Sequence, residues 1–424
     1  MAADLLAREA FDRAAALGDL YGQSLARTTQ GLIAIGLGDY RAALWYQEDA
    51  LRLKTTLNDV VGMTVALNNI GLVHLERNDL AAARVCFDRA LRDAREKGFA
   101  LAATLAAGNL GEVCLLTGEL TKVEPLVTEA LALAEGSNRR YYTAYCLCHL
   151  GTATALQGSL GRSLSLLLRS ESLFSEVGAR PEHSLALIAK SELLGLLGKR
   201  KEAETAARDA LSIAIDLGNP APVALARASL AHLLLMGDEV EAAHLLISDQ
   251  QADEARQRVP AHGLCRLLEA RAAIDIAQER PARAFERLQA LKSLARQAGL
   301  RPDLARGALI EAEALVKLGR RNEARIMLEQ ECANAREMGM RPLLSHLLLH
   351  LAQAQEALDD SAAAADSTFE AADLIRSIAE EIADTDMRAD YLGVPANAAI
   401  LQRAEQAARK GLRPRPAPGA ADLD

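Results

Sequence analysis

Glycine and asparagine recur along this chain at intervals of about 40 residues, and this repetition restricts the fold more than any other feature. Glycine and asparagine adopt left-handed backbone conformations at the least cost, so they commonly end helices. One series comprises Gly38, Asn78, Gly118, Gly158, Gly198, Gly237, Glu279, Gly319 and Asp359. A second series, half a period away, comprises Gly18, Asn58, Gly98, Asn138, Gly178, Gly218, Gly299 and Gly339. Two offset series predict two helices in each repeat, which we name helix A and helix B.

Proline and composition support this interpretation. Four prolines follow second-series glycines by two or three residues, where proline suits the first turn of a helix: Pro181, Pro220, Pro302 and Pro342. Hydrophobic residues make up 50% of the 424-residue chain but aromatic residues only 3%, so the apolar content is mainly alanine and leucine. Both are strong helix formers. We therefore expect an all-α chain in which each repeat packs on its neighbours.

The residues inside a repeat resemble the tetratricopeptide (TPR) consensus. Its helix A glycine is matched by Gly71, Gly111 and Gly151, and its paired small residues in helix B by Ala43/Ala50, Ala83/Ala90, Ala203/Ala210 and Ala364/Ala371. The usual period is 34, so this chain is similar to the long-period members found in kinesin light chains, spindle-orientation adaptors and bacterial sensor proteins. The resemblance implies a right-handed α-α superhelical solenoid of about nine helix pairs.

The predicted organisation has four parts. Residues 1–17 resemble a helix B without its helix A, because Ala7, Phe11 and Ala14 match Ala83, Phe87 and Ala90. We expect a solenoid at 18–382, capping helices at 383–409 and a disordered tail or linker at 410–424. A half repeat suggests a chain cut from a larger protein, or an end that packs on a partner or self-associates; an unusual natural start is the alternative.

The stretch from Ile378 to Pro395 resembles the end of the repeat arrays in bacterial STAND signal-transduction ATPases and in transcription regulators of the maltose-regulator type. Those proteins carry an ATPase switch domain before the repeats and often a DNA-binding or cyclase domain at one end. None of those domains is visible in this sequence. The resemblance implies that the repeats could sense an effector for such a switch domain.

Several classes of function are disfavoured. A net charge of −9 and a pI near 5.6 argue against direct nucleic-acid binding. We expect no membrane span, and six cysteines without framework spacing suit reduced thiols in the cytoplasm. No phosphate-binding loop or nucleophile elbow is present, so we expect no catalytic residue and no cofactor. Cys146, Cys148 and His149 are a weak metal candidate, because residues i and i+2 point to different faces of a helix.

The candidate binding residues lie along helix A. In proteins of the TPR family helix A forms the inner wall, and an asparagine before the Leu-Gly pair commonly contacts a bound peptide. Here that position holds Asn69, Asn109 and then His149. The same register directs further residues toward the groove, namely Asn68, Glu112, Tyr145, Thr152, Glu192 and Arg227. The alternative is that Asn69 and Asn109 hydrogen-bond between adjacent helices.

These observations predict a protein- or peptide-binding scaffold, used in bacterial signalling or regulation, whose concave groove holds its partner. The alternative is an effector-sensing module of a larger STAND ATPase or transcription regulator, which would bind a small ligand and relay it to a switch domain. An enzyme is a third possibility, and it would need a site that the motif search does not detect.

Overall fold

A computed structural model describes residues 2–248 and 259–412, and in those ranges the chain is helical with no strand. It divides into two compact units, Met1–His149 and Leu150–Asp424, with the boundary inside one helix. The predicted fold class is confirmed: the chain is an all-α solenoid of TPR-like helix pairs. The tail expected at 410–424 lies, from residue 413 onward, outside the described residues.

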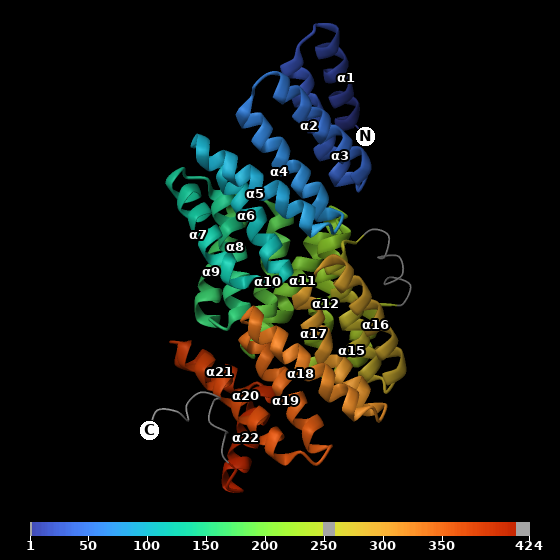
Figure 1. Cartoon of the computed structure of the whole chain (residues 1–424), viewed down its shortest axis with the longest axis vertical. Helices are drawn as coiled ribbons and strands as arrows, with labels where there is room; N and C mark the ends of the chain where they lie inside the picture. Colours follow the sequence, from blue (N-terminus) through green and yellow to red (C-terminus); the bar gives the residue numbers. More distant parts are fainter. Residues whose placement is uncertain (1, 249–258, 413–424) are drawn as a thin grey trace, which may run out of the picture. The chain divides into compact units, whose positions relative to one another are not determined.

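The first unit contains three complete pairs, preceded by a single helix and followed by the first part of α8 (Figure 1). From α1 to α7, each helix packs against the next one in the chain. The helices are α1 Ala2–Ala16, α2 Leu20–Leu37, α3 Tyr40–Thr56, α4 Val60–Glu76, α5 Leu80–Lys97, α6 Ala100–Thr117, α7 Leu120–Gly136 and α8 Arg140–Gln157.

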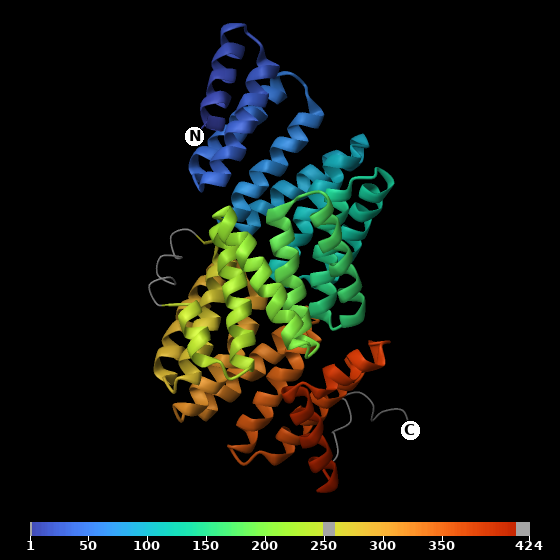
Figure 2. The ribbon, with the colours of Figure 1, turned by 180° about the vertical axis from the view of Figure 1, so that it is seen from behind.

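The second unit continues the pairing, and the green helices α9 to α12 lie next to one another in chain order (Figure 2). Its last two helices follow the final repeat. The helices are α9 Leu160–Glu176, α10 Arg180–Leu196, α11 Arg200–Leu217, α12 Pro220–Met236, α13 Val240–Leu246, α15 Ala261–Ala277, α16 Pro281–Ala298, α17 Arg301–Lys317, α18 Arg321–Met338, α19 Arg341–Glu356, α20 Ser361–Glu381, α21 Thr385–Gly393 and α22 Pro395–Arg409.

Left-handed backbone marks the helix ends with a strict period. From residue 18 to residue 238 a positive φ angle occurs at every twentieth residue. One assignment was wrong: the first series passes through Asp238, at φ 62°, and not through Gly237, at φ −99°. Gly237 has another role, because a Cβ atom there would lie 2.0 Å from the guanidinium carbon of Arg200. Gly237 therefore leaves room for the Arg200 side chain, and the left-handed turn is formed by the next residue, Asp238.

The TPR-like core depends on close approach of helix A to helix B. A Cβ atom on Gly71 would lie 2.5 Å from the ring of Phe87, and Ala83 and Ala90 are fully buried. Gly111 meets Val127 in the same way in the next repeat. The consensus small residues are therefore needed to bring the two helices of a pair together.

The alignment of α1 with helix B of a later repeat, drawn from the sequence, is shifted by one helical turn. Gly18 and Gly98 both end helices with positive φ and lie two periods apart, so Ala7 corresponds to Phe87. Ala7 and Ala14 are buried as expected, whereas Phe11 is half-buried under the guanidinium of Arg27, 3.5 Å from its ring centroid. The spacing of small residues fits Ala7 to either Ala83 or Phe87, and the position of the helix end selects Phe87.

Helix α6 departs from the expectation of no membrane-spanning run. Within the described residues, the window Ala100–Thr117 is long and apolar enough to cross a bilayer, with a mean hydropathy of 1.4. In the folded chain, 67% of that window is buried. A core helix passes the same test, because it too must be apolar on every face.

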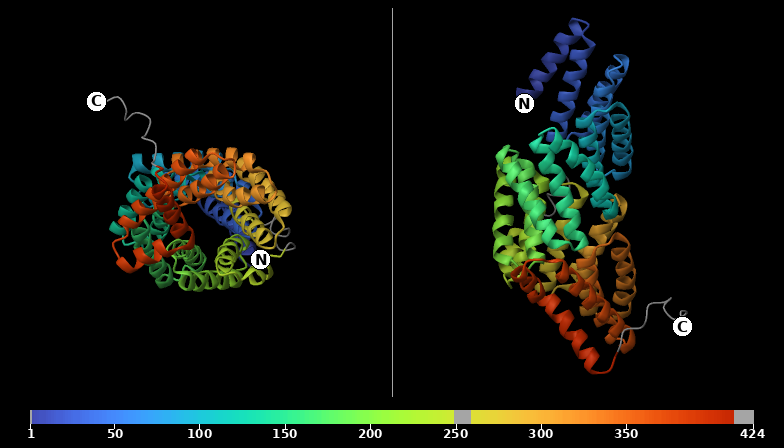
Figure 3. Two further views of the ribbon diagram at one scale, coloured as in Figure 1. Left: turned by 90° about the horizontal axis from the view of Figure 1, so that it is seen from below. Right: turned by 90° about the vertical axis from the view of Figure 1, so that its left-hand side faces the viewer.

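The second unit closes on itself. Arg341 Nε donates to the carbonyl oxygen of Gln157, and Nη1 of the same side chain lies 2.7 Å from Glu381 Oε1. Ser159 Oγ donates to the other oxygen of Glu381. The helices from α9 to α20 therefore follow a curved path that returns to its start, as the view from below shows (Figure 3).

Candidate functional site

In the first unit, four polar side chains from three successive helix A elements form a hydrogen-bonded row. Asn109 Nδ2 of α6 donates to Asn68 Oδ1 of α4 at 2.9 Å. The Tyr145 hydroxyl of α8 lies 2.8 Å from Asn109 Oδ1 and 3.0 Å from Glu112 Oε2. Gly108 makes this possible, because a Cβ atom there would lie 2.8 Å from the Tyr145 ring. The register therefore brings Asn68, Asn109, Glu112 and Tyr145 together as expected from their common face.

The asparagines of this row are largely enclosed. Asn68, Asn69 and Asn109 are 5%, 7% and 4% exposed, and Asn69 Nδ2 lies 3.4 Å from Gln47 Oε1. The alternative drawn from the sequence, hydrogen bonding between adjacent helices, describes these amides in the structure. Tyr145 and Glu112 are half-buried and cover the row. Ligand contact by the asparagines stays a prediction, and Tyr145 and Glu112 are the less enclosed polar side chains of this row.

The titratable side chains next to Glu112, Tyr145 and His149, are both neutral at neutral pH. Burial, followed by the Glu112 charge, raises the pKa of Tyr145 well above its usual value, so the phenol stays protonated. Burial also lowers the pKa of His149 to about 4. The His149 ring stands edge-on to the Tyr145 ring at 4.3 Å, and its Nε2 is buried without a hydrogen-bond partner. A neutral imidazole and a phenol therefore adjoin one carboxylate.

In the second unit, Glu192 belongs to an ion cluster that the sequence did not reveal. Its Oε1 accepts from Arg266 Nη2 at 2.5 Å, although the two residues are 74 positions apart. Arg266 also pairs with Glu269, and Arg306 Nη1 lies 4.0 Å from Glu192 Oε2. The cluster joins helix A of three different repeats, α10, α15 and α17. Thr152 and Arg227, the other two predicted residues in this unit, are half-buried.

The cluster remains charged near neutral pH. Burial tends to raise the pKa of Glu269, but the guanidinium groups of Arg266 and Arg306 outweigh it and lower the value to about 2. The same balance lowers the pKa of Glu192. Burial lowers the pKa of His232 to about 4, so this neighbour, with Nε2 3.6 Å from Glu269 Oε1, is neutral. One sequence feature could have indicated this cluster. Arg266 and Glu269 form a charged i, i+3 pair inside a helix that is rich in alanine and leucine.

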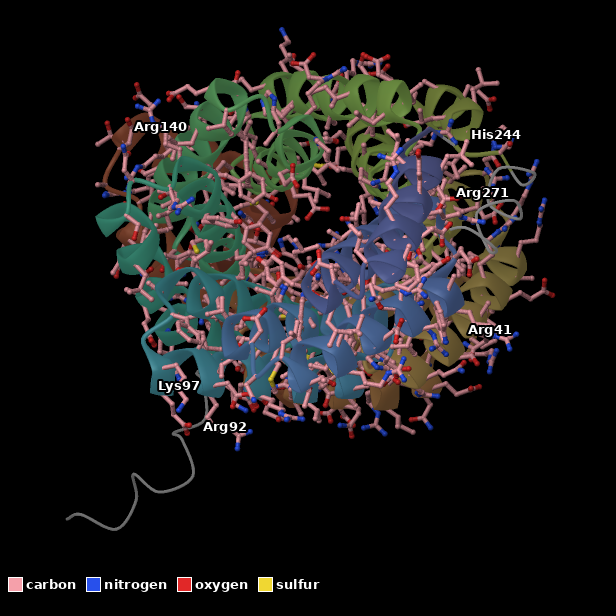
Figure 4. The ribbon with its side chains drawn as sticks, turned by 90° about the horizontal axis from the view of Figure 1, so that it is seen from above. Arg41, Arg92, Lys97, Arg140, His244 and Arg271 are labelled. Atoms are coloured by element: carbon pink, nitrogen blue, oxygen red, sulfur yellow. The ribbon has the colours of Figure 1, made fainter. Side chains whose placement is uncertain are left out.

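The outer surface of the first unit is formed by helix B side chains. Arg41 of α3 and Arg92 and Lys97 of α5 are exposed and point outward (Figure 4). A depression of about 480 Å³ lies beside α5 and α7, but its Arg84, Arg95 and Lys122 all pair with glutamates. On the second unit, His244 and Arg271 lie side by side, with 2.6 Å between Nδ1 and Nη1 (Figure 4).

The cysteines form no metal centre among the described residues, where no group of three or more metal-ligating side chains is found. All six cysteines are free thiols. Cys146 is buried, and burial raises the pKa of its thiol to about 12, while Cys148 is half-buried. Packed, protonated thiols are the role that this geometry supports.

No protein-family model matches this chain, and no curated protein sequence matches it either. Among solved structures, it is similar to a Rap protein complexed with competence and sporulation factor, with a TM-score of 0.53 and 13% identity; the match covers 82% of this chain and 98% of the Rap chain. This chain has the fold of a TPR-like repeat protein. Yeast Tom70 matches at 12% identity over 96% of both chains, with a TM-score of 0.41.

Proposed function

We propose that this protein is a binding scaffold for a protein or peptide, acting in bacterial signalling or regulation in the cytoplasm, and that it is not an enzyme. The observation that carries the proposal is the arrangement around Tyr145. The half-buried phenol of Tyr145 and the Glu112 carboxylate are hydrogen-bonded to a row of internally paired amides, which holds both side chains in one geometry. Binding groups that are already ordered lose less conformational entropy when a partner binds.

The chemistry of these residues also favours recognition over reaction. Tyrosine offers a large contact area at low entropic cost, and it is enriched in binding hot spots. The pKa of Tyr145 lies well above its usual value and that of His149 lies at about 4, whereas an effective general acid or base has a pKa near the working pH. The Rap structure, solved with competence and sporulation factor bound, offers a fold-level analogy for a bound factor.

The test is affinity capture from the native host, with the retained proteins and peptides identified by mass spectrometry. The variant Tyr145→Ala with Glu112→Gln should lose the specific partner, whereas Tyr142→Ala, another half-buried tyrosine of the same helix, should retain it. Circular dichroism and urea unfolding establish that both variants are folded. If both folded variants capture the partner equally well, Tyr145 and Glu112 are not part of the binding surface.

A second candidate is the effector-sensing module. The segment that resembles the end of STAND-type arrays includes Ile378 and Asp390, and both lie against the glycine turns after α8 and α10. That junction supports the idea that changes in solenoid curvature could reach the C-terminal helices. The same-chain version would be abandoned if the natural reading frame were found to begin at Met1 and end at Asp424.

A further inference from the structure

The two carboxylates of the ion cluster in the second unit differ strongly in burial. Arg266 and Glu269 are 3% and 8% exposed, whereas Glu192 is 34% exposed. Breaking a deeply buried ion pair is costly because it leaves an uncompensated charge, while a partly exposed carboxylate can return to water. Glu192 is therefore the carboxylate that can leave the cluster more readily.

One of the two cations of the cluster, Arg306, is incompletely hydrogen-bonded. Arg306 Nε lies 3.5 Å from Glu269 Oε2, but it is buried and has no hydrogen-bond partner, and its Nη1 is 4.0 Å from Glu192. Two guanidinium groups thus share two carboxylates, and only Arg266 has close hydrogen bonds to both. A carboxylate placed between Arg266 and Arg306 could bond to both cations, which Glu192 does not do.

We propose that Glu192 is an internal substitute for a ligand carboxylate, and that Arg266 and Arg306 form an anion-binding site which opens when Glu192 moves into solvent. The inference rests on the proposed binding function and adds a ligand class, a molecule that presents a carboxylate. Exchange of one carboxylate for another leaves the charge of the cluster unchanged. The gain is the second charge-assisted hydrogen bond, to Arg306.

Carboxylates of two origins fit this chemistry: an acidic side chain of a peptide and a small free dicarboxylate. Three probes separate them. They are a pool of N-acetylated, C-amidated hexapeptides with one central glutamate, the same pool with glutamine in its place, and sodium glutarate. Binding to the whole chain is measured by isothermal titration calorimetry at low ionic strength, where charge-assisted binding is least screened.

Two variants and two controls test the site. Glu192→Gln removes the competing charge, so the glutamate pool should bind about tenfold more tightly than to the wild type, and the glutamine pool should bind no better. Arg306→Gln should weaken glutamate-pool binding by a similar factor. Glu202→Gln, at an exposed carboxylate of α11, and Arg321→Gln, at an exposed residue of α18, change the net charge equally and should change neither affinity.

The outcomes are distinct. Preference of Glu192→Gln for the glutamate pool with little response to glutarate supports a peptide carboxylate, and tight glutarate binding supports a small dicarboxylate. Equal binding of both pools to the wild type and to Glu192→Gln overturns the anion site but leaves the peptide scaffold standing. Glutarate binding to Glu192→Gln without any peptide binding supports the site and counts against the scaffold. No binding of any probe to folded Glu192→Gln overturns the site as well.

Discussion

Arg341 Nε donates a hydrogen bond to the backbone carbonyl of Gln157, 184 residues earlier, at 2.5 Å. Next to that carbonyl, Gly158 packs on Ile378, with 3.0 Å between its would-be Cβ atom and the isoleucine Cγ1. The helix-ending glycine of the following repeat, Gly198, packs on Asp390. Such contacts limit how far the second unit can open, since repeats otherwise contact only their neighbours.

The closure predicts different costs at two glycines with the same backbone angle. Gly198 and Gly319 both have φ 77°, but a Cβ atom on Gly198 would lie 2.9 Å from the Asp390 carbonyl oxygen, while nothing lies within 4 Å of one on Gly319. Gly319→Ala should cost about 1–2 kcal/mol from left-handed strain alone. Gly198→Ala should cost about 1–3 kcal/mol more. Urea unfolding measures both; equal losses would mean that the C-terminal helices do not press on this turn.

Helix–helix packing in the first unit predicts opposite signs for two glycine-to-alanine changes within helices. Gly36 has open space around it, so Gly36→Ala should stabilise by about 0.5–1 kcal/mol through helix propensity. Gly71 faces the Phe87 ring, so Gly71→Ala should destabilise by about 1–3 kcal/mol through overpacking. Thermal and urea unfolding give both values. If Gly71→Ala stabilises the protein instead, the two helices are not closely packed at this position.

The buried ion cluster predicts a large penalty for removing its inner carboxylate. Glu269→Gln leaves Arg266, 3% exposed, without its most deeply buried ion-pair partner and with the partly exposed Glu192 as its remaining direct partner. We expect a loss of about 3 kcal/mol. The control Glu202→Gln removes a carboxylate that is 64% exposed and should change stability by less than about 1 kcal/mol. Comparable denaturant midpoints for the two variants would contradict the buried pairing.

Buried histidines predict a loss of stability in mild acid. Burial lowers the pKa of His149 from 6.5 to about 4, so between these values the unfolded chain binds more protons than the folded chain. The free energy of unfolding therefore falls as pH drops from about 6.5 toward 4, by at most about 1.4 kcal/mol per pH unit for each such histidine. His149→Gln should reduce that slope. Urea titrations at pH 7, 6 and 5 check it, and an unchanged slope would show that His149 titrates normally.

Much of the fold follows from residues that act locally. Helix ends need residues that tolerate positive φ, so the glycine and asparagine series predicted two helices per repeat, and proline marked helix starts. Even the misplaced Gly237 lies one residue from the true turn at Asp238. The same register predicted that Asn68, Asn109 and Tyr145 share one face, because helical periodicity determines which side chains are neighbours.

Tertiary structure decided which of those neighbours are enclosed and which distant residues meet. The asparagine row is buried because Tyr145, supported by Gly108, covers it, and this depends on how closely successive helices stack. Glu192 reaches Arg266, and Arg341 reaches Gln157, because a small rotation between repeats accumulates into a curve. That rotation is a sum over many weak packing contacts, so the sequence alone established the helices and their register, while the curvature that brings distant repeats together appears only in the folded chain.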